Sequence, residues 1–322
     1  MKRNSGLDLF RIMCCFGVLG SHVIDDVLAY ESSRMLWYAC SFCIPGFFML
    51  SGYLLACKES VTVEYAEKKV MSIIPKVFGW VLFWSFIHLA RTAEVYDIWD
   101  QTLGAVVSSG IEPVAWFLFS YAILLIFAPV LHYVLKKWPI AMYIFSVVCI
   151  VLLAMGFGDE IRETKAQVLW LHIYFAYFVL GMTLADLFNR ISGVIKYIGL
   201  AISAVLFMAM MYIYYRDEFV IGHGVLPDRH YGLWYYTIWV IAMFYMFWCI
   251  NIKNETVGKI IGIISKNTFT VYLGHLPILV YLTSINPLDT FASGIRMIFG
   301  LFIFTEIMAE LFKRMPVLRK LT

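Results

Sequence analysis

The chain has 322 residues, of which 62% are hydrophobic and only 15% are charged, and its mean hydropathy is +0.80. Soluble globular domains are about half apolar and about a quarter charged, so this chain has too few charged side chains to cover a soluble protein of its size. The formal net charge of +3 provides no strongly basic face, and the composition excludes nucleic-acid binders, disulfide-rich secreted scaffolds and disordered tails. The sequence therefore predicts a polytopic integral membrane protein.

Ten apolar segments of the chain are each long enough to cross a bilayer, because a membrane helix needs roughly 20 mostly apolar residues. Strand-like alternation is absent, which favours an all-α fold. The segments use most of the chain, so we expect a single transmembrane domain over residues 1–322 and no appended soluble domain. The predicted membrane helices cover residues 7–28, 35–57, 71–90, 113–135, 139–157, 168–188, 194–215, 231–252, 267–283 and 291–312.

The positions of the basic residues predict the orientation. If the N-terminus lies inside the cell, most of the 25 lysine and arginine residues fall in cytoplasmic segments, which is the positive-inside pattern. We therefore expect both termini to be cytoplasmic and the protein to lie in the inner or plasma membrane of the cell. No cysteine lies in an outer loop, so no structural disulfide is expected. The basic residues left in the outer loops are Arg34, Arg91, Arg162, Lys165, Arg216 and Arg229.

The first predicted helix carries two ionisable residues that share one face. Arg11 and His22 are eleven positions apart, which at 100° per residue is three turns plus about 20°, and roughly 16 Å along the axis. Cys15 lies between them on that face. Ionisable groups inside a membrane are unfavourable and by default mark a function. The alternative is that Arg11 extends to lipid phosphates and His22 caps the outer end of the helix.

Later segments carry four further motifs. The Ser-Gly step in the second segment allows close helix packing, and the basic stretch before the third either anchors that helix at the cytoplasmic face or binds phosphates there. A histidine in the ninth segment lies near the middle of the bilayer. The motifs are Phe-Phe-x-x-Ser-Gly-Tyr at residues 47–53, which includes Ser51; a basic stretch with Lys68, Lys69 and Lys76 around Ile-x-Pro; a fourth segment that opens with Glu112 and Trp116; and Tyr272-x-x-His275.

In this order and on these segments, the motifs resemble those of the acyltransferase 3 family, from the first segment to the ninth. The resemblance implies transfer of an acyl group, usually acetyl, from cytoplasmic acyl-CoA (acetyl-CoA) to a hydroxyl of a glycan or lipid-linked sugar at the outer face. It also implies that Arg11 and His22 form the essential pair, and that Lys68, Lys69 and Lys76 handle the donor. Acyl-CoA is then a co-substrate. No metal ion is expected, because no histidine and carboxylate pair has metal-ligand spacing.

The donor stretch departs from the family pattern. The family usually presents Arg-x-x-Arg ahead of Ile-x-Pro, whereas this chain has Lys69 and Ser72 at those positions. A lysine binds phosphate as a point charge and lacks the bidentate fork of arginine. We expect Lys76, directly after Pro75, to compensate for the lost charge.

These residues suggest a mechanism that spans the bilayer, which we state as a hypothesis. Arg11, oriented by Asp8, and the basic stretch hold the phosphates of acyl-CoA at the inner side, and the pantetheine arm runs past Cys15 to His22. His22 then acts either as the general base on the acceptor hydroxyl or as the carrier of a covalent acyl group, two routes that the sequence leaves open. Further residues expected to contact or support the substrates are Ser51 on the donor side and Glu112, Trp116, Tyr272, His275 and Arg296 on the acceptor side.

The alternative function is a secondary transporter, or a membrane domain for uptake or sensing of a small solute. Buried ionisable residues such as Arg11, His22 and Glu306 also suit a proton-coupled carrier. Many transporters, however, contain two related halves with interrupted helices in corresponding positions. The sequence shows no such internal correspondence, which favours the enzyme.

Overall fold

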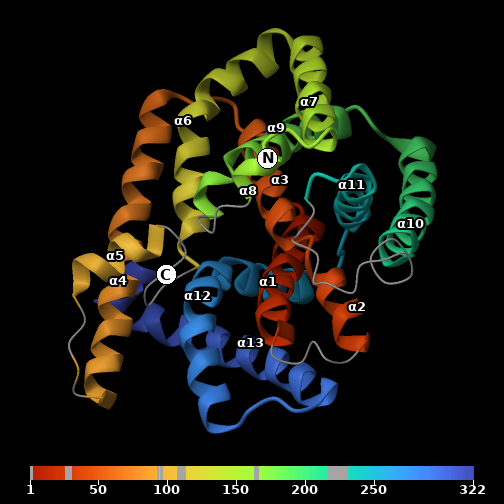
Figure 1. Ribbon diagram of the computed structural model, residues 1–322. Helices are drawn as coiled ribbons and strands as arrows, with labels where there is room; N and C mark the ends of the chain where they lie inside the picture. Colours follow the sequence, from red (N-terminus) through yellow and green to blue (C-terminus); the bar gives the residue numbers. More distant parts are fainter. Residues whose placement is uncertain are drawn as a thin grey trace.

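The computed structural model is helical throughout the part of the chain that it describes, which comprises residues 3–25, 31–92, 94, 97–106, 114–162, 167–216 and 231–322. The helices pack into a bundle in which α1 contacts α2, α3, α11, α12 and α13 (Figure 1). The elements are α1 (Ser5–Asp25), α2 (Glu31–Cys40), α3 (Cys43–Ala56), α4 (Val63–Thr92), α5 (Ile98–Val106), α6 (Trp116–Lys137), α7 (Pro139–Ala154), α8 (Asp159–Arg162), η1 (Gln167–Leu169), α9 (Leu171–Asn189), α10 (Gly193–Tyr215), α11 (Trp234–Cys249), α12 (Glu255–Ile285), α13 (Phe291–Arg314) and η3 (Leu318–Leu321).

Among the described residues, seven helical segments are long and apolar enough to cross a membrane. The helices α7 and α11 are also apolar but have only 16 residues each. Each of the ten predicted segments overlaps a helix, so the all-α class is confirmed, and the apolar helices indicate a multi-pass membrane protein. The count of ten spans and the side on which the termini lie stay predictions. The seven segments are Ser5–Ile24, Met35–Ala56, Val63–Thr92, Trp116–Lys137, Leu171–Asn189, Gly193–Tyr215 and Glu255–Ile285.

The second predicted segment, residues 35–57, is not one continuous helix. In the structure α2 ends at Cys40 and α3 begins at Cys43. Pro45 has no N–H to donate to the carbonyl of Ser41, four residues earlier, as a continuous helix requires. The hydroxyl of Tyr236 in α11 donates to this carbonyl instead, at 2.8 Å. The proline thus contributes to the break, and α11 satisfies the carbonyl group that it leaves open.

Two helices begin earlier than their apolar segments predict. Helix α4 starts at Val63 rather than at residue 71, and α12 starts at Glu255 rather than at residue 267. Side-chain caps fix both starts: the Thr62 hydroxyl accepts from the Tyr65 N–H at 3.1 Å, and the Asn254 side chain caps α12 with a bond of the same length. The basic stretch is therefore part of a helix, so each of its lysines has a defined direction.

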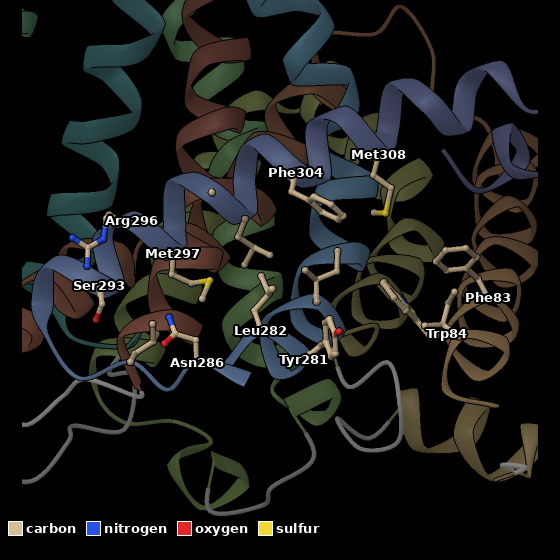
Figure 2. Close-up of a pocket in the computed structure, with 15 residues that line it drawn as sticks. Phe83, Trp84, Tyr281, Leu282, Asn286, Ser293, Arg296, Met297, Phe304 and Met308 are labelled. Carbon is tan, nitrogen blue, oxygen red and sulfur yellow. The ribbon is translucent and has the colours of Figure 1, made fainter. Parts of the chain in front are cut away.

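Helices α4, α12 and α13 border an open groove of about 690 Å³ on one side of the bundle (Figure 2). Its wall is mainly apolar. Ser293 and Arg296 of α13 lie at one end, and Phe83 and Trp84 of α4 lie at the other. The groove therefore has one polar end and one apolar end.

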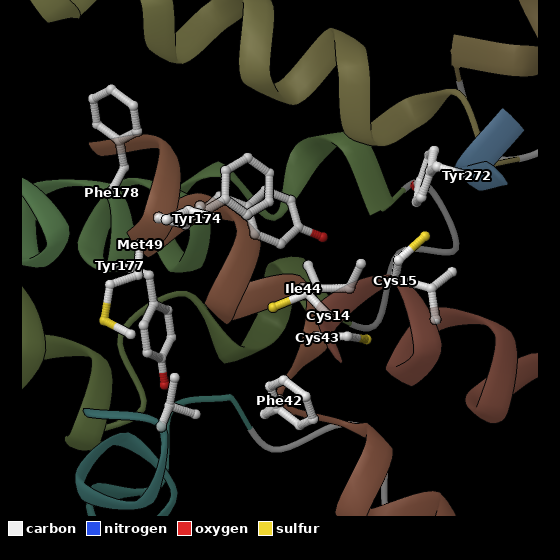
Figure 3. Close-up of a cluster of buried hydrophobic side chains, with 14 of the residues drawn as sticks. Cys14, Cys15, Phe42, Cys43, Ile44, Met49, Tyr174, Tyr177, Phe178 and Tyr272 are labelled. Atoms are coloured by element: carbon white, nitrogen blue, oxygen red, sulfur yellow. The ribbon is translucent and has the colours of Figure 1, made fainter. Parts of the chain in front are cut away.

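The contact between α3 and α9 anchors the core of the protein. Gly52 of α3 and Gly181 of α9 lie so close to the opposite backbone that a side-chain carbon on either would collide with a carbonyl oxygen. Rings, thiols and aliphatic side chains fill the space around this contact, with Cys15 and Tyr272 at one end of the view and Phe178 at the other (Figure 3). All seven cysteines are free thiols.

Candidate functional site

One face of α1 packs against α12, and this contact positions both ionisable residues of α1. Nη1 of Arg11 donates to Oγ of Ser265 at 3.2 Å, and the centroid of the His22 ring lies 5.3 Å from that of His275. Between them, Cys15 is fully buried, with its Sγ 3.7 Å from a carbonyl oxygen of α12. The contacts follow the same order along both helices, so the helices run parallel. The face that carries Arg11 and His22 therefore points into the protein.

Asp8 is placed to orient Arg11 through Ser265. Its Oδ1 accepts from Oγ of Ser265 at 2.9 Å and lies 4.0 Å from Nη1 of Arg11. Its other oxygen lies 2.5 Å from Nε of Arg3. Two guanidinium groups thus share a single carboxylate, which leaves a net positive charge at this end of α1. Such a site favours an anionic ligand.

Arg11 lines an open cavity of about 460 Å³ that is bordered by α3, α4, α6 and α12. Lys58 and Lys69 bring two more positive charges to its wall, and Nζ of Lys58 lies 5.0 Å from the centroid of the Tyr65 ring. Among the described residues, no carboxylate belongs to the lining. A cavity with cations and no acid attracts anions such as phosphate groups. The other lining residues are Phe47, Ser51, Leu54, Leu55, Phe117, Leu118, Tyr121, Thr268, Phe269 and Tyr272.

Three rings lie together at the other end of this cavity from Lys58. They come from Phe47 of α3, Phe117 of α6 and Tyr272 of α12, with centroids 5.3 to 6.4 Å apart. The hydroxyl of Tyr272 donates to the carbonyl of Val114 at 2.8 Å, which fixes its ring against α6. Phe47 and Lys58 are eleven positions apart, or roughly 16 Å for helical chain. The cavity is therefore charged at one end and aromatic at the other.

Tyr272 connects the aromatic end of the cavity with the histidine pair. Its carbonyl oxygen accepts from Nδ1 of His275 at 2.6 Å, so the lone pair of that imidazole is on Nε2. This Nε2 atom is buried and has no hydrogen-bond partner among the described residues. His275 is fully buried and His22 is half-buried. Two facing imidazoles thus lie about one helical turn beyond the rings, where they can accept a proton or carry a reacting group.

The structure separates the residues predicted to bind the donor. Lys69 and Ser51 line the cavity. Lys68 is exposed and pairs with a glutamate one turn away on α4, at 2.6 Å. Lys76 donates to a carbonyl oxygen of the last residue, at 2.7 Å, and does not line the cavity. Lys69 is therefore the lysine of the basic stretch that faces the cavity.

The residues predicted to support the acceptor lie in three different places. Tyr272 and His275 adjoin the aromatic end of the cavity. Trp116 is buried, and its ring stacks on that of Tyr174 with centroids 5.4 Å apart. Arg296 lies in the groove between α4, α12 and α13. Glu112 lies outside the described residues.

The route past Cys15 that the sequence predicts differs from the observed cavity. Cys15 is packed against α12 and is absent from the lining, and the cavity follows α3, α6 and α12 instead. Lys58, Tyr65 and Tyr121 line it, although sequence reasoning did not single them out. The sequence does contain a signal for Lys58. Residues 51, 55 and 58 have helical spacing, which predicts that Lys58 lies on the same face as Ser51.

Comparison with known proteins identifies a family. A family model described as an acyltransferase domain matches residues 4–309, a range that includes the cavity lining and both histidines of the pair. No curated protein and no solved structure matches the chain.

Proposed function

The chain belongs to the acyltransferase 3 family, and from this premise we propose that it is an O-acyltransferase of a cell membrane. It moves an acyl group, in the simplest case acetyl, from cytoplasmic acyl-CoA to a hydroxyl of a glycan or lipid-linked sugar on the outer side. The family and the apolar helices already indicate a membrane acyltransferase. The donor, the acceptor and the membrane are the proposed parts.

The cavity supports acyl-CoA as the donor. Arg11, Lys58 and Lys69 suit the phosphates of the nucleotide, and the apolar remainder suits the pantetheine arm. A volume of about 460 Å³ lies within the range of roughly 300–1,000 Å³ that is usual for small-molecule sites. We assign the phosphates to the charged end and the thioester to the aromatic end beside Tyr272.

In the direct route, His22 acts as a general base. It takes the proton of the acceptor hydroxyl while the hydroxyl oxygen attacks the thioester carbon, and the carbon–sulfur bond breaks. The proton is returned to the sulfur, so CoA leaves as the thiol. His275, held in one tautomer by the Tyr272 carbonyl, presents its Nε2 lone pair as a second proton acceptor within the pair.

In the relay route, His22 is the nucleophile. Its nitrogen attacks the thioester carbon, CoA leaves as the thiol, and an acyl-imidazole forms. The acceptor hydroxyl then attacks this acyl group and releases His22 unchanged. Rapid-quench experiments separate the two routes, because only the relay route releases CoA in a burst before any acceptor is added.

Purified protein in lipid vesicles tests the proposal. Acetyl-CoA is supplied on the side of Lys58 and Lys69, and a sugar acceptor is supplied on the other side. The enzyme releases one CoA thiol for each acetylated sugar. The alternative function, a solute transporter, moves the sugar and releases no CoA, and that outcome would overturn the proposal.

A further inference from the structure

The three rings at the aromatic end of the cationic cavity form a continuous wall. The ring centroids of Phe47, Phe117 and Tyr272 lie 5.3 to 6.4 Å apart. Aromatic rings pack directly against each other at centroid separations of about 4.5–7 Å. All three side chains line the cavity, so at this end the cavity meets a wall of packed rings.

Tyr272 contacts both the cavity and the histidine pair. It lines the cavity, and the centroid of its ring lies 6.0 Å from that of His275. The His275 ring in turn lies 5.3 Å from the ring of His22, centroid to centroid. Neither histidine is among the described residues that line the cavity. The ring of Tyr272 therefore lies where the cavity and the two imidazoles adjoin.

The proposed acyl transfer requires the acyl group to pass this ring. Attack on the thioester carbon requires the reacting atoms to come within about 3–3.5 Å of each other. A thioester in the cavity meets Tyr272 before it meets His275 or His22, because both imidazoles lie beyond the cavity lining. The acyl group must therefore enter space that this ring occupies. A larger acyl group displaces the ring further from its packed position, which is unfavourable in a close-packed interior.

Two hydrogen bonds hold the side chain and the backbone of Tyr272 in place. Its hydroxyl donates to the carbonyl of Val114 at 2.8 Å, and its own carbonyl accepts from Nδ1 of His275 at 2.6 Å. The residue is 5% exposed, so the ring has little free space. Because the second bond uses the backbone, a change of the side chain leaves the partner of His275 in position. The ring can thus be altered without removing the group that sets the His275 tautomer.

We propose that Tyr272 determines which acyl groups this protein transfers, because its ring admits short groups such as acetyl and excludes longer ones such as butyryl. The proposal rests on the proposed acyl transfer and narrows the donor to short-chain acyl-CoA. The ring occupies the space beside the imidazoles that additional methylenes would need. Space for one methylene in an apolar pocket usually corresponds to about 10–200-fold discrimination between substrates.

Replacement of Tyr272 tests this assignment in the full-length protein in vesicles. Acetyl-CoA and butyryl-CoA are compared as donors to one sugar acceptor. Tyr272→Ala should raise the ratio of kcat/KM for butyryl-CoA to kcat/KM for acetyl-CoA about tenfold or more. Tyr272→Leu, which keeps more of the apolar volume, should raise the ratio less, and Tyr272→Phe should keep the parent ratio because the ring remains. An unchanged ratio in both Tyr272→Ala and Tyr272→Leu would overturn the proposal.

Tyr121→Ala is the matched control. Tyr121 lines the same cavity and lies one turn of α6 beyond Phe117. This turn leads towards the charged end, because His132, further along α6, contacts the carbonyl of Lys58. Tyr121→Ala therefore enlarges the cavity away from the histidines and should leave the ratio unchanged. An equal rise in Tyr121→Ala and Tyr272→Ala would mean that the total cavity volume limits the acyl group, and the proposal would be wrong.

Thiol labelling tests the position of the Tyr272 ring without any reaction of acyl-CoA. Val18 lies on the His22 face of α1, one turn before His22, and is 2% exposed. In a background without the native cysteines, Val18→Cys should react slowly with a methanethiosulfonate reagent. It should react about tenfold faster when Tyr272→Ala is added, because a large-to-small substitution leaves a cavity where the ring stood. Ser51→Cys, on the cavity wall, should react at the same rate with either residue at position 272.

The two measurements distinguish failure of this proposal from failure of the proposed function. If no form of the protein releases CoA from any acyl-CoA, the proposed function fails, whereas labelling still shows whether the ring separates the cavity from the His22 face of α1. If CoA is released but Tyr272→Ala keeps the parent preference for acetyl, the enzyme stands and the role of Tyr272 is wrong. Equal labelling of Val18→Cys with and without the Tyr272 ring would also overturn the proposal.

Discussion

The two ends of α1 differ in character although they lie on one face of one helix. Around Arg11 the wall is cationic, carries Lys69 and borders a cavity. Around His22 the neighbours are a second imidazole and packed apolar side chains, and His22 does not line that cavity. About 16 Å of helix separates them. In the proposed mechanism donor binding and chemistry occupy different ends of α1, so substitutions at the two ends should change different measured quantities.

The largest expected effect is at the His22 end. His22→Ala removes the base or carrier and should lower acyl transfer by roughly 10²–10⁴-fold, with the Kd for acyl-CoA unchanged. Release of CoA and equilibrium binding of acyl-CoA measure the two quantities. His88→Ala, on α4 and outside both the cavity and the pair, is the control. Residual activity above a few per cent would move the base elsewhere, first to His275.

Substitutions at the Arg11 end should instead change the affinity for acyl-CoA. Arg11→Ala removes a charge from the cavity wall and should raise the Kd for acyl-CoA by about tenfold or more, since hydrogen bonds to charged groups contribute about 1.5–3 kcal/mol. Arg11→Lys should restore only part of the affinity, because it keeps the charge and loses the fork. Titration of the purified protein with acyl-CoA measures both variants. Unchanged affinity in both would remove Arg11 from the donor site.

Substitution of Lys69 on α4 should change the affinity for acyl-CoA less than substitution of Arg11 does, and its neighbour Lys68 provides a matched control. Lys69 lines the cavity, whereas Lys68 is exposed and paired on the surface. Lys69→Ala should raise the Kd for acyl-CoA about three- to fivefold at low salt, and less at high salt, because a partly solvated charge is screened. Lys68→Ala should leave the Kd unchanged. Equal losses in the two variants would mean that the basic stretch acts only through its overall charge.

Thiol labelling tests which path acyl-CoA follows between the two ends of α1. In a background without the other cysteines, Thr268→Cys should react with a bulky thiol reagent, and acyl-CoA should protect it, because Thr268 lines the cavity. Native Cys15 alone should react slowly, since it is fully buried against α12. The rate of labelling is the measurement. If Cys15 is labelled quickly and acyl-CoA prevents this labelling, the donor runs past Cys15 along α1, as the sequence predicts.

Much of the helical layout could be predicted from local properties. Apolar length alone located a helix for each of the ten segments, and helical spacing placed Arg11 and His22 on one face. The interruption after Cys40 was not predicted, because a proline alone does not decide it: prolines also lie inside the continuous helices α4, α6 and α12, and a distant tyrosine satisfies the carbonyl that Pro45 leaves open. The early starts of α4 and α12 were missed as well, because their first turns are polar and carry no hydropathy signal.

The candidate site was predictable only in part, because it depends on neighbours that are far apart in sequence. The periodicity of α1 could not show that α12 covers its ionisable face, so the pairing of His22 with His275 came from the structure. The same holds for Lys58, which joins the cavity because α3, α4 and α6 converge there. Lys68 and Lys69 look equivalent in sequence, yet they point about 100° apart on a helix.

The sequence by itself determined that the chain is a bundle of apolar helices, that it resembles one family, and that two ionisable residues share a face of the first helix. These properties follow from composition and from the 3.6-residue repeat, which act within a single segment. Only the tertiary structure decided which helix covers that face, which lysines meet Arg11 at one cavity, and that Arg296 lies in a groove apart from it. Those outcomes depend on how separate helices pack, and packing joins residues that no local pattern relates.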